Sequence, residues 1–183
     1  ILEKLLPLGL PVLTEEQGEI GVDATSGLKF VVDPLDGTVN FVRGLGGSSI
    51  CIALCENNQP IFGVLCTIPD GDIIWGGKGM GAYQNELALN VSNISNLAES
   101  VVCTGFPARF PIEDTDASKA YIKRMSSFAK VRMLGSAALS LQSVARGSAE
   151  VYMEENIMLW DVAAGLAIVE GAGGVVSVSN GSV

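Results

Sequence analysis

Short apolar runs separated by turn residues characterise the first half of the chain. Residues 28–32 form an apolar, β-branched run that ends at Asp33-Pro34, which predicts a buried strand stopped by a proline-containing turn. Three further strand-like runs follow, at residues 49–54, 60–68 and 73–76. Because turn residues separate each run from the next, we expect an antiparallel meander.

Strand-like and helix-like patterns alternate in the second half. The strand-like runs are residues 101–102, 131–134, 150–153 and 175–178, and the helix-like runs are residues 116–129, 136–146 and 161–170. Such alternation predicts layers of helix and sheet, and hence an α+β fold. Since no repeat or linker interrupts the chain, we expect a single domain over residues 1–183, with a meander half (1–100) and an alternating half (101–183).

The composition favours a globular protein and narrows the choice of partners. Of the 183 residues, 48% are hydrophobic and 17% are charged, which is enough apolar material to bury a core. The net charge of -9 and the scattered Lys and Arg residues exclude nucleic acid, because phosphate backbones are bound by clustered cations. Charged residues and prolines interrupt the apolar start, residues 1–13, far short of a membrane span, so we expect no membrane insertion.

The chain contains no histidine, which removes several kinds of site at once. Ser-His-Asp triads, histidine phosphotransfer and the commonest zinc sites all need it. Carboxylates must then carry the chemistry, and a phosphorylated substrate would need a bound cation to meet so acidic a protein. The four cysteines lie in apolar runs without CxxC spacing, which indicates buried, reduced thiols and a cytoplasmic protein. They are Cys51, Cys55, Cys66 and Cys103.

Acidic residues lie where predicted elements end. Glu15 and Glu16 follow an apolar run, and Asp161 precedes a predicted helix. Asp33 and Asp36 lie in the sequence Asp-Pro-Leu-Asp-Gly-Thr. Each alone has an ordinary explanation, since Asp-Pro and Asp-Gly favour turns and Asp161 can cap its helix. The ends of elements are nevertheless where functional sites are usually built.

Taken together, the acidic residues indicate a metal site. Pro34 restricts the backbone, so that the Asp33 and Asp36 carboxylates and the Leu35 carbonyl can converge as hard oxygen ligands for Mg²⁺. Two ionised carboxylates about 5 Å apart repel by roughly 3 kcal/mol at an effective dielectric constant near 20, so a cluster of them favours a divalent cation. The segment from Thr38 onward can start a short helix whose free N–H groups point at an anion.

Several motifs resemble those of the inositol monophosphatase family in both order and spacing. They are residues 14–16 (Thr-Glu-Glu), 33–41 (Asp-Pro-Leu-Asp-Gly-Thr-Val-Asn-Phe), 77–83, 135–138 (Gly-Ser-Ala-Ala) and 159–165 (Leu-Trp-Asp-Val-Ala-Ala-Gly). The resemblance runs from about Glu15 to Ser179. It implies a layered α-β-α-β-α sandwich of the sugar-phosphatase type. It also implies Mg²⁺-dependent, lithium-sensitive hydrolysis of a phosphate monoester by metal-activated water.

The resemblance also implies a role for each matching residue. Glu15, Asp33 and the Leu35 carbonyl would hold one Mg²⁺. A second Mg²⁺ would share Asp33 and take Asp36 and Asp161 as its other ligands. Glu15 and Thr38 would position the attacking water and help to deprotonate it, with Asp36 also counted as catalytic. Glu16 would support the ligands without touching the metal.

Substrate contacts are implied for a partly overlapping set of residues, namely Asp36, Gly37, Thr38, Ala137, Glu154 and Asp161. Glu154 matches a family carboxylate that accepts a hydrogen bond from a substrate hydroxyl. The neighbouring Glu155 leaves open the alternative that both acids are simply solvated.

Inositol monophosphate or a related sugar phosphate is the expected substrate, because Val39, Asn40 and Phe41 are closer to inositol phosphatases than to nucleotide phosphatases. Two other activities remain open, 3′(2′),5′-bisphosphate nucleotidase and fructose-1,6-bisphosphatase. An alternative of another class is a non-catalytic homologue that binds metal or a sugar phosphate. We also expect a homodimer.

The chain departs from the family pattern in two respects. Thr14 replaces the usual glycine before the paired acids. The family's N-terminal helices and the tail beyond the last strand are largely missing, so we expect a chain truncated at both ends.

Two rival phosphate-binding motifs are weak. Cys103 and Arg109 have the C-x5-R spacing of cysteine-dependent phosphatases, but Pro107 lacks an N–H for the phosphate and no histidine precedes the cysteine. Gly77-Lys78-Gly79 is not a Walker A loop, because no Ser or Thr follows the lysine.

Overall fold

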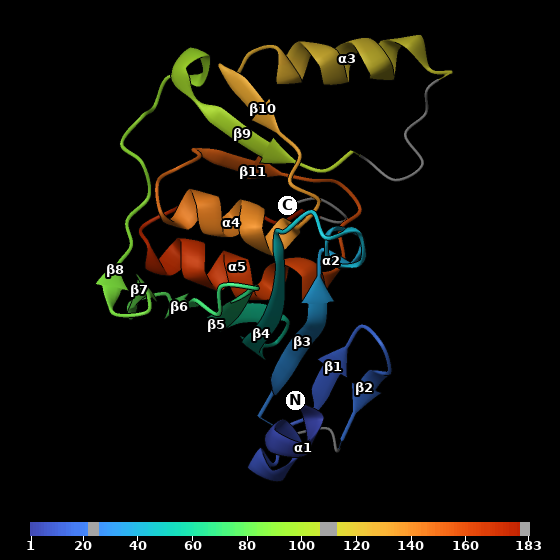
Figure 1. The fold of residues 1–183 in the computed structure, drawn as a ribbon, viewed down its shortest axis with the longest axis vertical. Coiled ribbons are helices and arrows are strands. Elements are labelled where there is room, and N and C mark those ends of the chain that lie inside the picture. Colours follow the sequence, from blue (N-terminus) through green and yellow to red (C-terminus); the bar gives the residue numbers. More distant parts are fainter. Residues whose placement is uncertain (22–25, 107–112, 180–183) are drawn as a thin grey trace.

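An eight-stranded sheet forms one broad layer of the computed structural model, which describes residues 1–21, 26–106 and 113–179 (Figure 1). In spatial order its strands are β2 (Gly18–Ile20), β1 (Val12–Thr14), β3 (Leu28–Asp36), β4 (Ser48–Glu56), β5 (Gln59–Ile68), β6 (Ile73–Gly77), β7 (Gly81–Gln84) and β8 (Leu87–Ala88). From β3 to β8 every pair is antiparallel, which confirms the predicted meander. β1 and β2, which the sequence analysis did not predict, extend the sheet beyond β3.

β3 is longer than predicted. The expected stop at Asp33-Pro34 is wrong, because the strand continues to Asp36. Its pairing with β4 is irregular there, since Asp33 lies opposite Cys51 and Asp36 opposite Ser49. The extra residue makes a bulge, and a bulge accommodates a proline because it needs no ladder N–H at that position.

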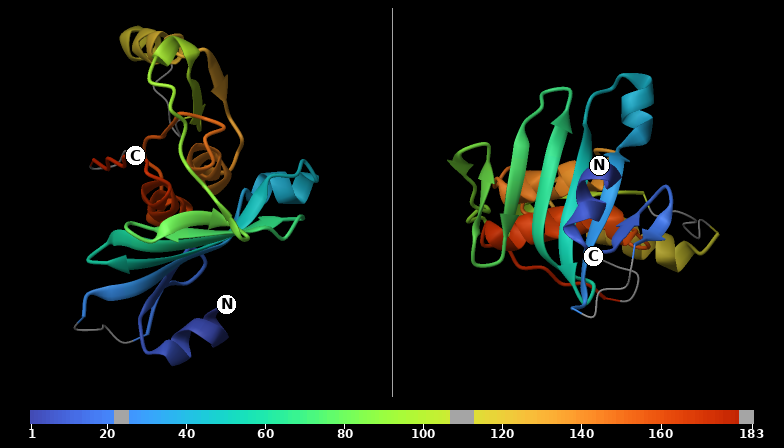
Figure 2. Two further views of the ribbon diagram at one scale, coloured as in Figure 1. Left: turned by 90° about the vertical axis from the view of Figure 1, so that its left-hand side faces the viewer. Right: turned by 90° about the horizontal axis from the view of Figure 1, so that it is seen from below.

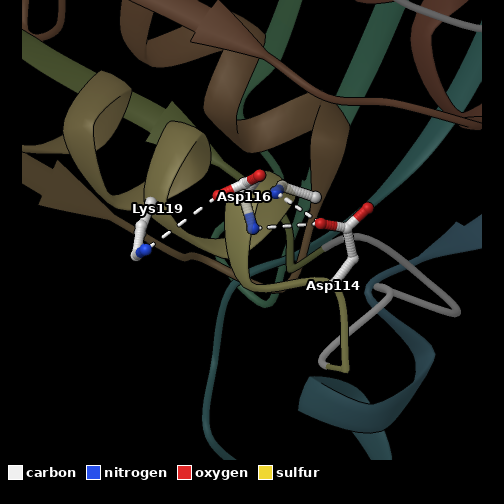
Figure 3. Close-up of polar contacts among 4 residues, drawn as sticks. Asp114, Asp116 and Lys119 are labelled. Atoms are coloured by element: carbon white, nitrogen blue, oxygen red, sulfur yellow. Dashed lines mark hydrogen bonds and ion pairs between the residues drawn. The ribbon is translucent and has the colours of Figure 1, made fainter.

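A second sheet of three parallel strands forms another layer, with β9 (Val101–Thr104) between β10 (Lys130–Arg132) and β11 (Val151–Met153). It follows the short 3₁₀ helix η2 (Leu97–Glu99), and α3 (Thr115–Met125) covers its outer face (Figure 1). The Asp114 carboxylate caps α3 by accepting hydrogen bonds from the N–H groups of Asp116 and Ala117, both at 3.0 Å (Figure 3). The helix begins one residue earlier and ends four residues earlier than the predicted helix at residues 116–129.

Two helices, α4 (Ala137–Ala145) and α5 (Leu159–Gly171), lie between the sheets (Figure 2). α5 is buried along most of its length, as its almost continuous apolar sequence requires. It packs closely on the larger sheet, because the missing side chain of Gly63 leaves room for the backbone of Ala164. One core cluster joins sheet residues such as Leu65 and Ile74 to residues of both helices.

The N-terminal helix α1 (Leu2–Leu5), followed by η1 (Leu6–Leu8), lies on the other side of the larger sheet (Figure 2). From α3 to α1 the layers are helix, sheet, helix, sheet and helix, so the expected α+β sandwich is confirmed. The last predicted strand is wrong, because residues 174–178 form none and Val175 is 96% exposed. Alternating apolar residues become a strand only where a neighbouring edge supplies hydrogen bonds. Within the described ranges, no helix is long and apolar enough to cross a membrane.

Candidate active site

Three carboxylates from distant parts of the sequence meet at one point. Asp33, Asp36 and Asp161 each offer an oxygen, and these oxygens lie within 4.8 Å of one another. The separation of Asp36 and Asp161 is therefore short enough for both to reach one ion. Asp33 and Asp36 are almost fully buried, and Asp161 is partly buried. Buried acids without a partner are costly, so this cluster calls for a cation.

Local structure directs each of the three carboxylates. The bulge in β3 separates Asp33 and Asp36, and the Asp33 carboxylate accepts the Leu35 N–H at 2.8 Å. Asp161 does not occupy the N-cap that its sequence position allows. It lies in the first turn of α5, and its carboxylate accepts the N–H of Met158, the N-cap residue, at 3.2 Å. The first turn of a helix favours a negative charge.

Asp36 is held by the start of α4. Its carboxylate accepts hydrogen bonds from the Ser136 hydroxyl and from the Ala138 N–H, the latter at 3.1 Å. The Ser136 oxygen also accepts the Leu139 N–H at 3.1 Å and so caps α4. Ser136 has no role predicted from the sequence. A serine before an apolar helical run is a capping signal, but nothing local places it beside an acid 100 positions away.

The predicted short helix after the Asp-Gly-Thr motif is present as α2 (Thr38–Arg43). Gly37 precedes it with φ of 78°, and a side chain there would come within 2.8 Å of the Gly47 carbonyl, so glycine is needed on both grounds. The Thr38 hydroxyl donates to the Leu35 carbonyl at 2.9 Å, close to the carboxylates. Asn40, a second residue without a predicted role, donates to the carbonyls of Gly47 and Leu134 and fixes α2 against the loop before α4.

Burial raises the pKa of all three carboxyl groups, and repulsion from neighbouring acids adds to it for Asp33 and Asp161. Burial is the main cause for Asp33, whose pKa rises to about 7, and the charges of Asp36, Glu15 and Asp161 add to it. Burial likewise raises the pKa of Asp161 to about 6. The pKa of Asp36 also rises through burial, although its hydrogen bonds from Ser136 and α4 oppose the change.

The residues of the cluster fit a divalent metal ion. None of the ion pairs found among residues 1–21, 26–106 and 113–179 involves Asp33, Asp36 or Asp161, so no neighbouring ammonium or guanidinium neutralises them there. Hard carboxylate oxygens are the donors that Mg²⁺ prefers. A divalent ion would turn their repulsion into attraction.

Glu15 and Glu16 lie just beyond β1 and are exposed. Glu15 is not part of the cluster of three, yet its charge raises the pKa of both Asp33 and Asp161, so it lies near them. The roles predicted for Glu15 and Glu16 stay predictions.

A cavity of about 340 Å³ opens beside the carboxylates. Its lining includes Asp36, Gly105, Ala137, Glu154 and Asp161. The Ala137 N–H points to Asp36, whose carboxylate accepts it. The lining of the cavity is thus acidic, since Asp36, Glu154 and Asp161 all belong to it.

Glu154 and Glu155 differ sharply in their surroundings. Glu154 lines the cavity, and its pKa is raised mainly by burial. Glu155 instead pairs with Arg124 of α3 at 3.3 Å, with both side chains about half exposed. The tertiary structure therefore distinguishes two acids that the sequence left equivalent.

The cysteine rival finds no support in the environment of Cys103. This thiol is buried in β9, and burial raises its pKa, whereas a nucleophilic cysteine needs a lowered one. Pro107 and Arg109, the rest of the motif, lie outside the described residues. All four cysteines are free; Cys66 is half-buried and the other three are buried.

A polar cavity beside converging carboxylates, set between the helices and sheets of an α+β sandwich, is an arrangement suited to a metal ion and a small polar ligand. The inositol monophosphatase family model matches residues 7–182, and the chain belongs to this family. It is a family of metal-dependent phosphatases.

Individual relatives carry different names. The chain is 38% identical over 175 residues to "Nus factor SuhB" of Pasteurella multocida, which covers 93% of this chain and 63% of the relative. It is 36% identical to a fructose-1,6-bisphosphatase/inositol-1-monophosphatase of Thermotoga maritima, covering 81% of this chain and 56% of the relative. The solved inositol monophosphatase of Anabaena superposes with a TM-score of 0.80 at 33% identity, covering 90% of this chain and 65% of that one. The chain thus spans roughly three fifths of the length of these relatives.

Proposed function

We propose that the protein hydrolyses a phosphate monoester, inositol monophosphate or a related sugar phosphate, with Mg²⁺ held at the carboxylate cluster. The observation that carries the proposal is the convergence of Asp33, Asp36 and Asp161 beside the 340 Å³ cavity. Family membership supports the reaction class, and the names of the Thermotoga and Anabaena relatives support the substrate class.

Each residue would act through its place in the site. Asp36 and Asp161 would hold one Mg²⁺, Glu15 and the Leu35 carbonyl would hold a second, and Asp33 would be a ligand of both. Bound Mg²⁺ would lower the pKa of water and neutralise phosphoryl charge. The Thr38 hydroxyl donates to the Leu35 carbonyl, so its oxygen is free to accept a hydrogen bond from the attacking water and orient it. Glu154, which also lines the cavity, would accept a hydrogen bond from a substrate hydroxyl.

The substrate is best tested by steady-state hydrolysis with the full-length protein and Mg²⁺. Inositol 1-phosphate, fructose 1,6-bisphosphate and adenosine 3′,5′-bisphosphate distinguish the three activities that the family offers. We expect the highest kcat/KM for inositol 1-phosphate. Activity that persists after thorough chelation would contradict the metal mechanism. Metal binding without turnover of any ester would favour the non-catalytic alternative.

Asp33→Asn should abolish hydrolysis while the protein stays folded, because Asp33 is the acid proposed to bridge two ions and its neutral amide keeps the same shape. Circular dichroism and Mg²⁺ titration would separate loss of the site from loss of the fold. Cys103→Ser serves as the matched control and should retain activity. An inactive Cys103→Ser protein that still binds Mg²⁺ would instead favour a thiolate mechanism.

Ion specificity provides a further test. Ca²⁺ should compete with Mg²⁺ and inhibit, because it is larger and prefers more ligands at 2.3 to 2.6 Å. Li⁺ should inhibit as well, as the family resemblance implies. Mg²⁺ dependence without Li⁺ inhibition would contradict the inositol-phosphatase assignment but would agree with the metal mechanism.

We further propose a cytoplasmic homodimer. The free thiols support a reducing compartment, and exposed apolar side chains on and after α2 support an interface. Those side chains are Val39, Phe41, Val42 and Leu45. Light scattering at micromolar concentration would check the dimer, and a monomer would contradict it.

A further inference from the structure

Gly105 and Glu154 lie at the same end of the smaller sheet, and both line the cavity. β9 and β11 are parallel neighbours, and Thr104 pairs with Met153. Gly105 and Glu154 directly follow β9 and β11, so the chain leaves the sheet at the same end in both places. Both line the 340 Å³ cavity that holds Asp36 and Asp161.

Two donors hold the Glu154 carboxylate there. The Tyr152 hydroxyl donates to Glu154 Oε2 at 2.9 Å, and the backbone N–H of Gly105 is a second donor. Tyr152 and Glu154 lie two positions apart at the end of β11, so they point to the same side of the sheet. Burial and the charge of Glu154 raise the pKa of Tyr152, so the phenol stays protonated and keeps donating.

Gly105 also leaves the space that Glu154 occupies. A side-chain carbon at Gly105 would overlap the Glu154 carboxylate, and its φ is not in the left-handed region, so the need for glycine is one of space. The overlapping atoms are the end of a flexible side chain. A methyl group there would therefore push Glu154 aside rather than unfold the strand.

A carboxylate fixed in this way has a definite chemical use. Tyr152 and Gly105 satisfy part of its accepting capacity, and because Glu154 lines the cavity its remaining lone pairs can accept hydrogen bonds from the hydroxyl groups of a ligand there. A side chain that is already ordered loses little entropy when it binds a ligand. The ligand that fits is a polyhydroxylated phosphate ester.

We propose that Tyr152 and Gly105 are positioning residues that fix Glu154 in the cavity and thereby select phosphate esters that carry free hydroxyl groups. This inference rests on the proposed phosphatase function. Tyr152 and Gly105 would contribute to substrate specificity, whereas the carboxylate cluster and its metal would bind the phosphate of any ester.

The test compares two esters on the full-length protein with Mg²⁺. Inositol 1-phosphate has hydroxyl groups for Glu154 and p-nitrophenyl phosphate has none. Tyr152→Phe should raise KM for inositol 1-phosphate by about tenfold, as expected for loss of a hydrogen bond to a charged group. The kinetic constants for p-nitrophenyl phosphate should change by less than about twofold. Gly105→Ala should have the same selective effect.

A double-mutant cycle separates positioning from mere packing. Once Glu154→Gln has weakened the same interaction, adding Tyr152→Phe should change KM for inositol 1-phosphate by less than about twofold. Tyr83→Phe, which removes a hydroxyl from β7 in the other sheet, is the control and should leave both esters unaffected.

Three outcomes would overturn the inference. In the first, Tyr152→Phe and Gly105→Ala change the kinetic constants for both esters equally. In the second, they change the constants for neither ester. In the third, Tyr152→Phe still raises KM for inositol 1-phosphate in the Glu154→Gln background. If the unsubstituted protein hydrolyses both esters, these results refute only the positioning roles. If it hydrolyses neither, the proposed function fails and the inference fails with it.

Discussion

Asp36 connects the two halves of the chain at the level of single residues. It lies in a bulge of β3, yet its hydrogen bonds come from Ser136 and Ala138 at the start of α4. The buried carboxylate is therefore oriented before any ion arrives. Side chains that orient a metal ligand in this way contribute to affinity although they never touch the metal.

Ser136→Ala should weaken Mg²⁺ binding by about 10- to 100-fold, the usual effect of removing a partner of a metal ligand. The loss of the α4 cap should also lower the stability by about 1 kcal/mol. Isothermal titration calorimetry well below the melting temperature would isolate the first effect. Ser177→Ala, at an exposed serine, is the control. Unchanged Mg²⁺ affinity in Ser136→Ala would show that Asp36 needs no such support.

The raised carboxyl pKa values make a prediction about pH. The pKa of Asp33 rises from 3.8 to about 7, so between these values the folded state binds more protons than the unfolded state. The metal-free protein should therefore lose stability as the pH rises from 3.8 to about 7, and the loss should level off above that pH. Calorimetry in chelator at a series of pH values checks this. Stability that increases over the same range would contradict it, and Asp33→Asn should flatten the dependence.

At the level of elements, the position of α5 decides where Asp161 lies. The helix rests directly on β5, because Gly63 has no side chain to hold Ala164 away. Asp161 lies in the first turn of the same helix. Packing in the middle of α5 and geometry at the carboxylate cluster are therefore linked.

Gly63→Ala should both destabilise the protein and weaken Mg²⁺ binding. The added methyl group would overlap the backbone of Ala164, and overpacking of this kind typically costs about 1–3 kcal/mol. If α5 shifts to relieve it, Asp161 moves away from Asp33 and Asp36. Denaturant unfolding and Mg²⁺ titration measure the two effects, and a loss of stability without any change in affinity would show that α5 moves independently of the site.

At the level of the whole molecule, a bound ion would connect the two halves of the sequence. Asp33 and Asp36 belong to the meander half, and Asp161 belongs to the alternating half. A ligand that binds only the folded state stabilises everything that must fold to make its site.

Mg²⁺ at 100 times its dissociation constant should stabilise the protein by about 2.7 kcal/mol. For a chain of this size that corresponds to a rise in melting temperature of roughly 5–10 °C. Calorimetry should show a single transition that moves as a whole, which would also test the prediction of one domain over residues 1–183. Asp161→Asn should abolish the shift. Two transitions, only one of which responds to Mg²⁺, would divide the chain into separate units.

The sequence by itself determined the features that depend on neighbouring residues. Apolar runs between turn residues predicted the meander strands, and the patterns at residues 136–146 and 161–170 predicted the central helices, which the structure places at Ala137–Ala145 and Leu159–Gly171. The acidic motifs were visible for the same reason, because Asp33, Asp36 and Asp161 each stand near the predicted boundary of an element. Their joint match to one family then predicted the layered sandwich.

Only the tertiary structure decided which residues face one another. Local sequence could not show that Ser136 donates to Asp36, or that Glu155 pairs with α3 while Glu154 faces the cavity, because those contacts join elements far apart in the chain. The predicted end of β3 was wrong, because β4 pairs with β3 around a bulge and the strand continues past Pro34. The predicted strand at residues 175–178 was wrong as well, because no neighbouring strand in the described part of the chain pairs with it. The apolar periodicity of a segment shows which of its side chains can be buried, whereas the tertiary structure determines which other segment packs or pairs with it.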